Sequence, residues 1–357
     1  MLSCFIVFAR KIKKILILIL FSIFYFLSSR SAFAHEAYVL THQEFSQGLA
    51  SNTPHPLAPF FDPQYIQISA IITICVVVAY ILVIVWSTTS FALFLDKAIR
   101  KATVIGPLII RLAISASFFY AAQANAVLGP ELTLVGIPGG IAIRFLLFVI
   151  ALMVLSGIFV EVAAFVGLLI FIYITKFYGL YMITYANYLG ELLVLFFFGS
   201  RFLSFDRYFF GKKAWFQKLE KLRNIETPLV RILYGIALMY AGWTIKFQHQ
   251  ELSVMVYNQY HLKDFFHAQA SFIASGAGLS EIAIGLFISL GFAMRFTILI
   301  SLFFITLSIL YFREMLWPHF MLYGISFSLL INSADTFTID RYMIPWARRL
   351  RKSIFRV

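Results

Sequence analysis

The sequence holds very little cysteine, and this scarcity excludes several kinds of site. Cys4 and Cys75 are the two cysteines among 357 residues. Cys4 precedes the first apolar run and Cys75 lies inside a later one, so a disulfide framework, a CxxC pair and a cysteine metal site are all excluded. Any redox chemistry of this chain would therefore not use its own thiols.

Charge is scarce as well, at 13% of residues, whereas 61% of residues are hydrophobic and 41 are Phe. A soluble core cannot bury that much apolar surface, so the chain is predicted to be an all-α polytopic membrane protein in contact with the lipid bilayer. The formal net charge of +13 is explained by Lys and Arg gathered in cytoplasmic loops. No nucleic-acid partner is predicted.

Common catalytic motifs are also absent. The HExxH, Walker, Rossmann and nucleophile-elbow patterns do not occur, and the pieces "HEAYV" and "HQE" lack a second histidine at the required spacing. The motifs therefore assign no enzyme class.

The N-terminus has the layout of a secretory signal. Basic residues at positions 10–14 precede an apolar stretch over 15–27, which "SSRSAFA" follows. Residues 1–34 are therefore predicted to be a cleaved signal peptide that leaves His35 as the first residue, with an uncleaved signal anchor as the alternative. Residues 35–64 contain four prolines and are predicted to form a periplasmic segment with little structure of its own.

About nine transmembrane helices are predicted after the signal peptide. They lie within 65–101 (apolar from 66 to 94) and near 107–126, 138–157, 159–178, 182–200, 229–247, 272–290, 293–312 and 318–334. Very short connections near Gly157 and Gly291 predict antiparallel hairpins there.

The basic segments fix an orientation. Segments 96–101, 201–223 and 341–356 carry 3, 7 and 6 Lys or Arg residues. With nine spans, all three segments fall on one side, which the positive-inside rule makes the cytoplasm. The predicted location is a bacterial inner membrane, with a periplasmic mature N-terminus and a cytoplasmic C-terminus.

The last eight predicted helices divide into two similar sets of four. "LSFDRYFF" ends the first set and "FTIDRYMI" ends the second, and Gly157 and Gly291 are separated by the same 134 residues as these two motifs. A constant offset predicts an internal duplication, and an even number of helices per copy gives two parallel-repeat four-helix bundles. The predicted parts are a first unit (102–208), a basic cytoplasmic linker (209–226), a second unit (227–345) and a basic cytoplasmic tail (346–357).

Several charged residues lie within or at the edges of apolar segments, where each is costly unless it is paired or near an interface. Arg144 and Glu161 occupy the second and third helices of the first unit, whereas Glu281 and Arg295 occupy those helices in the second. Because the signs are exchanged, each pair is predicted to meet across its hairpin. Such a pair could fix the helix register, or it could form a proton or quinone-head site.

The second unit carries an ordered set of motifs. "RILYGIALMYAGWTIKF" is followed by "SGAGLSEIAIGLFISLGFAMRFT" and then by "FTIDRY". This order resembles the DoxX-like (DoxX/DoxD) family of four-helix membrane proteins over about 227–345. The resemblance implies a membrane protein associated with redox systems, since relatives include quinone-reducing thiosulfate oxidoreductase subunits. The first unit resembles a diverged copy without a lysine matching Lys246, so a site is expected in the second.

This resemblance leads to a first hypothesis, a subunit of a quinone-linked membrane redox complex that works with redox partner proteins. The predicted catalytic residues are Lys246, Glu281 and Arg295, and the predicted cofactor-binding residues are Arg144, Glu161 and Arg231.

Two other hypotheses remain open. All seven histidines fall on the predicted periplasmic side, and imidazoles together with a free terminal amine can hold copper. The predicted copper set is His35, His42, His261 and His267; interfacial polar roles and proton transfer near a quinone are the alternatives. A small-solute carrier is the third hypothesis, because a parallel repeat with interface charges suits one, although the chain lacks clear proline or glycine breaks at mid-membrane depth.

Overall fold

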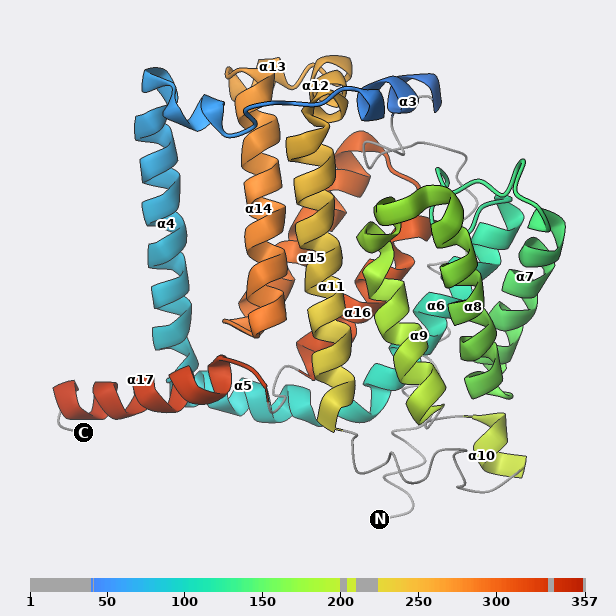
Figure 1. The fold of residues 1–357 in the computed structure, drawn as a ribbon. Helices are drawn as coiled ribbons and strands as arrows, with labels where there is room; N and C mark the ends of the chain where they lie inside the picture. The colour runs from blue at the N-terminus through green and yellow to red at the C-terminus, as the bar shows by residue number, and fades with distance from the viewer. Residues whose placement is uncertain (1–39, 41, 200–203, 210–223, 333–336, 356–357) are drawn as a thin grey trace, which may run out of the picture.

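The computed structural model describes residues 40, 42–199, 204–209, 224–332 and 337–355 (Figure 1). The predicted signal peptide, His35 and most of the basic linker lie outside these residues. The longer described helices are α3 (His42–Ala50), α4 (Pro63–Ser87), α5 (Ser90–Arg100), α6 (Gly106–Gln123), α7 (Gly140–Ser156), α8 (Val160–Tyr178), α9 (Ala186–Phe198), α11 (Glu226–Trp243), α12 (Gln250–Gln259), α14 (Ala270–Leu290), α15 (Met294–Phe312), α16 (Phe320–Ile331) and α17 (Asp340–Phe355). The short elements are η1 (Ala58–Phe61), η2 (Thr103–Ile105), η3 (Gly179–Tyr185), α10 (Phe205–Phe209), η5 (Thr244–Gln248), α13 (Lys263–Phe266) and η6 (Trp317–His319).

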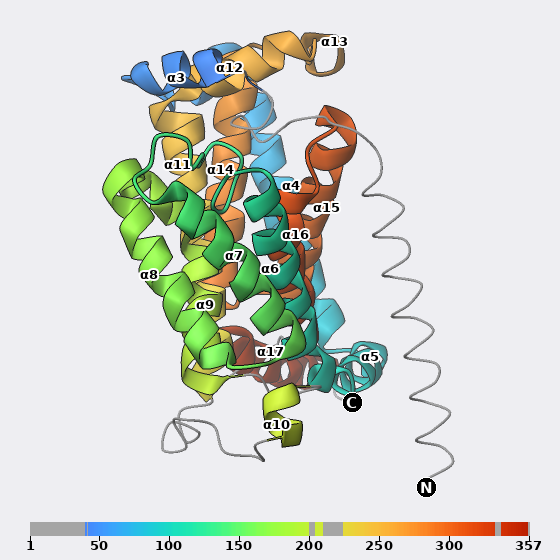
Figure 2. The same cartoon turned by 90° about the vertical axis from the view of Figure 1, so that its right-hand side faces the viewer.

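The long helices run side by side between two faces of the molecule (Figures 1 and 2). Helices α3, α12 and α13 cover one end, called here the upper face, while α5, α10 and α17 lie at the other, the lower face. Within the described residues, five helical segments are long and apolar enough to cross a membrane: Pro63–Ser87, Val160–Phe198, Glu226–Gln248, Ala270–Leu290 and Met294–Phe312. The chain is thus an all-helical, multi-pass membrane protein, and the count of nine spans stays a prediction.

Two tight hairpins join α7 to α8 and α14 to α15. Gly157 (φ 75°) and Gly291 (φ 64°) end the first helix of each hairpin in the left-handed conformation that glycine adopts without strain. Phe159 and Ala293 then also take positive φ, of 47° and 43°, directly before the next helix. The predicted antiparallel hairpins are therefore present.

Glycines let α11 and α14 approach closely. A Cβ atom on Gly285 would lie 2.5 Å from the Gly235 carbonyl oxygen, and one on Gly242 would lie 3.0 Å from the Gly278 carbonyl oxygen. Small residues at such a crossing are typical of helix pairs in membranes, where close backbone packing replaces the hydrophobic driving force.

The apolar run predicted as one helix over 66–94 is divided in the structure. Helix α4 ends at Ser87, and the hydroxyl of Thr89 accepts a hydrogen bond from the Ala92 amide at 3.2 Å, which caps the start of α5. Helix α5 is amphipathic and lies across the lower face, as α17 does (Figure 1). Both have the character of helices that lie in a membrane interface.

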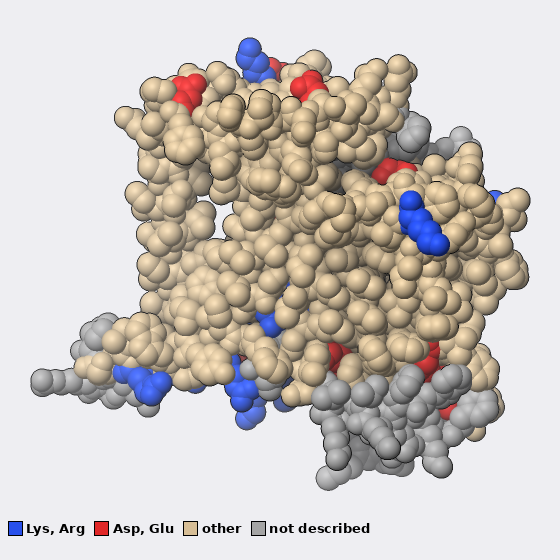
Figure 3. Space-filling view, in the orientation of Figure 1, with Lys and Arg blue, Asp and Glu red and all other residues tan. Residues whose placement is uncertain are grey.

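Helix α4 stands apart from the bundle and is held at two aromatic contacts. Near the upper face, the ring of Tyr65 stacks on Phe272 with centroids 4.1 Å apart. Near the lower face, the ring of Tyr80 stacks on Phe292 at 5.3 Å, and its hydroxyl lies 3.1 Å from that of Thr297. A gap between α4 and the bundle is visible in Figure 3.

The prediction of little structure over 35–64 is wrong for the described part of that segment. Residues 42–50 form α3, because Leu40 and Phe45 are buried against Leu252 and Val256 of α12. The apolar side chains of this segment pack on α12, in the loop between α11 and α14. The local sequence does not reveal this long-range contact.

Candidate functional site

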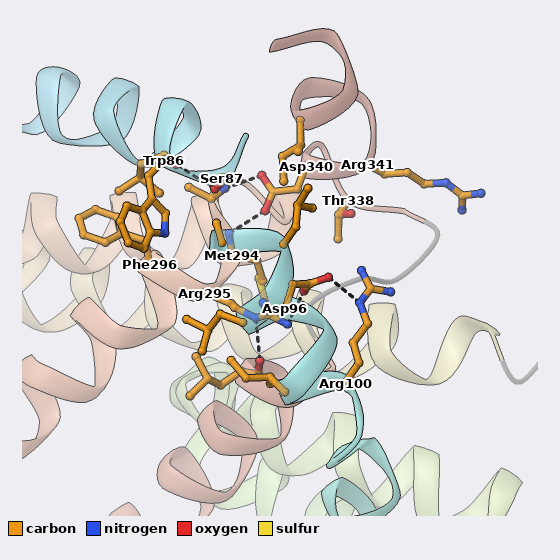
Figure 4. Close-up of a pocket in the computed structure, with 18 of the residues that line it drawn as sticks. Trp86, Ser87, Asp96, Arg100, Met294, Arg295, Phe296, Thr338, Asp340 and Arg341 are labelled. Atoms are coloured by element: carbon orange, nitrogen blue, oxygen red, sulfur yellow. Dashed lines mark hydrogen bonds and ion pairs between the residues drawn. The ribbon is translucent and has the colours of Figure 1, made fainter. Parts of the chain in front are cut away.

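A pocket of about 1000 Å³ opens at the lower face between α5, α15 and α17 (Figure 4). The last turn of α4 contributes Trp86, and α15 contributes Phe296 and Leu299 to walls that are mainly apolar. Charged side chains share these walls: Asp96, Arg100, Arg295, Asp340, Arg341 and Arg348. The pocket therefore joins an apolar wall to a cationic rim.

Asp96 links two arginines inside this pocket. Its Oδ1 lies 2.6 Å from Nη2 of Arg295, and its Oδ2 accepts a hydrogen bond of 2.7 Å from Nε of Arg100. Arg295 also donates from Nε to the Leu330 carbonyl at 3.3 Å, which orients its guanidinium toward the pocket from the end of α16. One carboxylate between two guanidinium groups leaves net positive charge available to a ligand.

Asp340 lies in the same wall of the pocket, but its carboxylate binds backbone amides. Its carboxylate oxygens accept hydrogen bonds from the amides of Ala293 at 2.7 Å and Met294 at 2.8 Å, which caps the start of α15. Burial raises the pKa of Asp340, and the two amide hydrogen bonds counter part of that rise. The motif "FTIDRY" thus fixes α17 to the α14–α15 hairpin.

Lys246 and Glu281 form a second charged pair, higher in the molecule. Nζ of Lys246 lies 3.5 Å from Oε1 of Glu281, and the lysine side chain is 10% exposed. Lys246 is carried by η5, a π-helical turn that continues α11, and such turns recur at functional sites. The pair joins the two helices that the glycine crossing brings together.

Arg231 is almost fully buried and binds backbone. It is 1% exposed and donates to the carbonyls of Ile288 at 3.0 Å, Phe337 at 2.9 Å and Ser289. These contacts satisfy the carbonyl groups that the end of α14 leaves open. Arg231 thereby stabilises the α14–α15 hairpin, whose second helix carries Arg295 in its first turn.

Arg231, Lys246, Glu281 and Arg295 lie in one segment that a family model recognises. Residues 227–314 match the DoxX family model. The predicted resemblance of the second unit to this family is therefore confirmed for α11 to α15. No curated protein and no solved structure matches the chain.

The DoxX segment holds the three predicted catalytic residues in two places. Glu281 pairs with Lys246, whereas Arg295 pairs with Asp96 at the lower face. The predicted pairing of Glu281 with Arg295 is wrong, because Glu281 lies ten residues before Gly291, which is about 15 Å of helix.

The first unit lies outside the DoxX match, and its predicted ion pair is not formed. Arg144 donates to the Ala122 carbonyl of α6 at 2.7 Å, near the start of α7. Glu161 is the second residue of α8 and lies beside Gly199 at the lower end. The two residues are separated by roughly 20 Å of helix α7, so the predicted pairing across the hairpin is wrong here too. The cofactor-binding roles of Arg144, Glu161 and Arg231 stay predictions.

The predicted copper ligands do not form a cluster within the described part of the chain. His261 and His267 flank α13 on the upper face, each with positive φ, and His42 opens α3. No group of three or more His, Cys, Asp or Glu side chains among the described residues is placed to hold a metal ion. His35 lies outside those residues, so its role stays a prediction.

Sequence reasoning missed Asp96, Arg100 and Trp86 as site residues. All three fell within one predicted span, where Trp86 belonged to the apolar run and Asp96 and Arg100 belonged to its charged end. The signal that could have separated them is "STTS" at Ser87–Ser90, since Thr is a frequent helix cap, followed by the amphipathic pattern over 90–100.

Proposed function

We propose that this DoxX-containing protein is the quinone-binding subunit of a membrane redox complex, and that the quinone headgroup binds in the lower-face pocket. The observation that carries the proposal is an apolar pocket of about 1000 Å³ that contains a paired arginine and aspartate. A partner protein would supply the electrons, which a bound quinone carries through the membrane.

The polar groups of the pocket suit this ligand. The carbonyl oxygens of a quinone need hydrogen-bond donors, and Arg295 and Arg100 offer charged N–H groups. The hydroxyls of the reduced form need an acceptor, and the Asp96 carboxylate is placed between the two arginines. Trp86 and Phe296 provide aromatic surfaces for the ring.

The apolar surroundings suit the tail of a quinone. Val83 and Leu299 line the pocket, and Leu82 and Val85 on α4 are 62% and 53% exposed. A long hydrocarbon tail would leave the pocket along α4, where the gap beside the bundle lies (Figure 3). In this proposal Arg295 binds the headgroup, while Lys246 and Glu281 hold α11 on α14.

The proposal includes the two-unit organisation and the orientation. Equivalent contacts support a duplication of 102–208 and 227–345. Arg111 donates to the carbonyls of Val154 and Leu155, and Arg231, 120 residues later, donates to those of Ile288 and Ser289, each 134 residues later. Basic side chains gather on the lower face in the view of Figure 3, which favours a cytoplasmic lower face and a periplasmic upper face in the inner membrane.

Tryptophan fluorescence tests the proposal. Short-chain ubiquinone and menaquinone analogues, added to the purified protein in nanodiscs, should quench emission saturably through Trp86. Trp86→Phe should remove the saturable part, whereas Trp243→Phe, on the exposed face of α11, should keep it. Arg295→Gln should weaken binding by about tenfold, because a charge-assisted hydrogen bond is lost.

Three outcomes contradict quinone binding. They are quenching that rises linearly without saturation, quenching that Trp86→Phe leaves intact, and an affinity unchanged by Arg295→Gln. Displacement of the analogue by an anionic phospholipid, with no effect of quinone redox state on affinity, would instead identify the pocket as a lipid headgroup site.

A further inference from the structure

A row of proton-bearing side chains descends through the interior of the first unit. It begins at Glu131, in the loop between α6 and α7 near the upper face. The hydroxyls of Tyr185 and Tyr181 both donate to Oε1 of Glu131, the latter at 3.2 Å. Burial raises the pKa of Glu131 to about 7, although these hydrogen bonds oppose the rise. Glu131 can therefore take up and release a proton near neutral pH.

The row continues from Tyr185, the last residue of η3, into α9. Tyr185, Tyr188 and Glu191 are spaced by three residues, which places them on neighbouring turns of one helix face over roughly 9 Å. The rings of Tyr185 and Tyr188 have centroids 6.0 Å apart. The Tyr188 hydroxyl shares a short hydrogen bond with that of Ser117 on α6, and both residues are buried.

Glu191 ends the row in the middle of the bundle. The residue is 0% exposed, and neither carboxyl oxygen has a hydrogen-bond partner within the described part of the chain. An ionised carboxylate in such surroundings is strongly disfavoured, so the group is held as the neutral acid.

The fold does not require these residues. In the second unit, the positions 134 residues later on η6 and α16 are His319, Leu322 and Ile325, and Ile325 is 0% exposed. An apolar side chain therefore fills the place of Glu191 in a helix of the same kind. A buried acid that packing does not need, three residues after a buried tyrosine on the same helix, indicates a task other than stability.

We propose that Glu131, Tyr185, Tyr188 and Glu191 form a proton-transfer path from the upper face to the centre of the first unit. Each hydroxyl accepts a proton from the group above and gives its own to the group below, with Ser117 beside Tyr188 as a further donor and acceptor. The last transfer requires the Tyr188 hydroxyl to turn from Ser117 toward Glu191, whose carboxyl oxygens have no other hydrogen-bond partner in the described part of the chain. No electron moves, and each transfer breaks one O–H bond and forms another. The path is separate from the lower-face pocket and does not depend on quinone binding.

Infrared spectroscopy of the full-length protein in lipid tests the path. The C=O stretch of a protonated carboxyl group shifts when the protein is moved into D₂O and its proton exchanges. The measurement is made about two pH units above the pKa of Glu131, where that carboxyl is ionised. A band that disappears in Glu191→Gln identifies the Glu191 acid.

The tyrosines provide the decisive variants because Tyr→Phe keeps the shape of the side chain. Tyr185→Phe and Tyr188→Phe should slow exchange of the Glu191 band by on the order of a hundredfold, the low end of what a positioned proton-transfer group contributes. Tyr234→Phe is the matched control: this buried tyrosine of α11 bonds to Ser301 and Ser326 in the second unit, and exchange should keep its rate.

Two results would overturn the path. One is a carboxyl band that persists in Glu191→Gln; the other is an exchange rate that both tyrosine variants leave unchanged. Circular dichroism and elution volume identify variants that do not fold, and the two Tyr→Phe variants decide the outcome if Glu191→Gln is among them.

Discussion

The two regions predicted as four-helix units, 102–208 and 227–345, contain similar backbone contacts and differ in the side chains that they enclose. In each unit an arginine on the first helix binds carbonyls at the end of the second, and a glycine with positive φ turns the chain into the third. The first unit then encloses tyrosines and a buried acid, whereas the second carries a charged pair and one wall of a pocket. The residues that hold the helices together are therefore different from those that line the candidate sites, and substitutions can test each group separately.

The largest expected effect concerns the frame. Arg231→Met and Arg111→Met should each lower the free energy of unfolding by about 3 kcal/mol, because each leaves buried carbonyls without a charged donor. Equal losses in unfolding of the protein in mixed micelles would support equivalent roles. Arg144→Met, which removes one bond to Ala122, is the control and should cost less. A large loss of stability for only one of these two variants would contradict equivalent roles for Arg111 and Arg231.

Alanine at the glycine crossing of α11 and α14 should lower the free energy of unfolding by about 2 kcal/mol. Gly285→Ala places a Cβ atom against the Gly235 carbonyl, so α11 and α14 must separate at a cost typical of overpacking. The position 134 residues earlier, on α7, is already alanine, Ala151, so a Cβ atom is present there. Gly276→Ala, where a Cβ meets nothing within 4 Å, should be neutral or stabilising in the same unfolding measurement.

Glu131 should give the first unit a pH dependence that the second lacks. Its pKa rises from 4.5 to about 7 on folding, so between these values the folded state binds more protons and stability falls as pH rises. The loss should reach at most about 2 kcal/mol and level off above pH 7, since the residue is partly exposed. Unfolding of the wild type and of Glu131→Gln across pH 4–8 checks this, and an identical slope in the variant would contradict it.

The smallest expected effect is an increase in the free energy of unfolding. Glu191→Ile copies the second-unit residue into the first unit and should raise the free energy of unfolding by about 1 kcal/mol, because a buried polar group is replaced by an apolar one of similar size. Thermal unfolding in nanodiscs measures the gain. A loss of stability would mean that Glu191 has a structural partner and would weaken the contrast between the units.

Sequence alone located α6 to α9, α11, α14 to α16 and the two hairpins because their signals are local, but it did not find α3 or the break between α4 and α5. Long apolar runs mark the helices, and Gly157 and Gly291 mark the turns. The two ion pairs were predicted wrongly because the charge signs were matched without considering how far apart the length of α7 and of α14 places the charges. Asp96 and Arg295 are 199 residues apart, and no periodicity within either helix reveals that they meet. The contacts of Glu131 with Tyr185 were hidden for the same reason.

The outward-facing side of α4 beyond Tyr80 sets the route into the proposed quinone site. Trp86 lines the pocket, and Leu82 and Val85 beside it are 62% and 53% exposed, so a quinone would enter the Arg295 pocket sideways, out of the bilayer, without crossing water. Occupancy is then set by the mole fraction of ligand in the lipid and not by its aqueous concentration. Diluting the protein with extra lipid at fixed total ligand should therefore empty the pocket, while adding buffer should not.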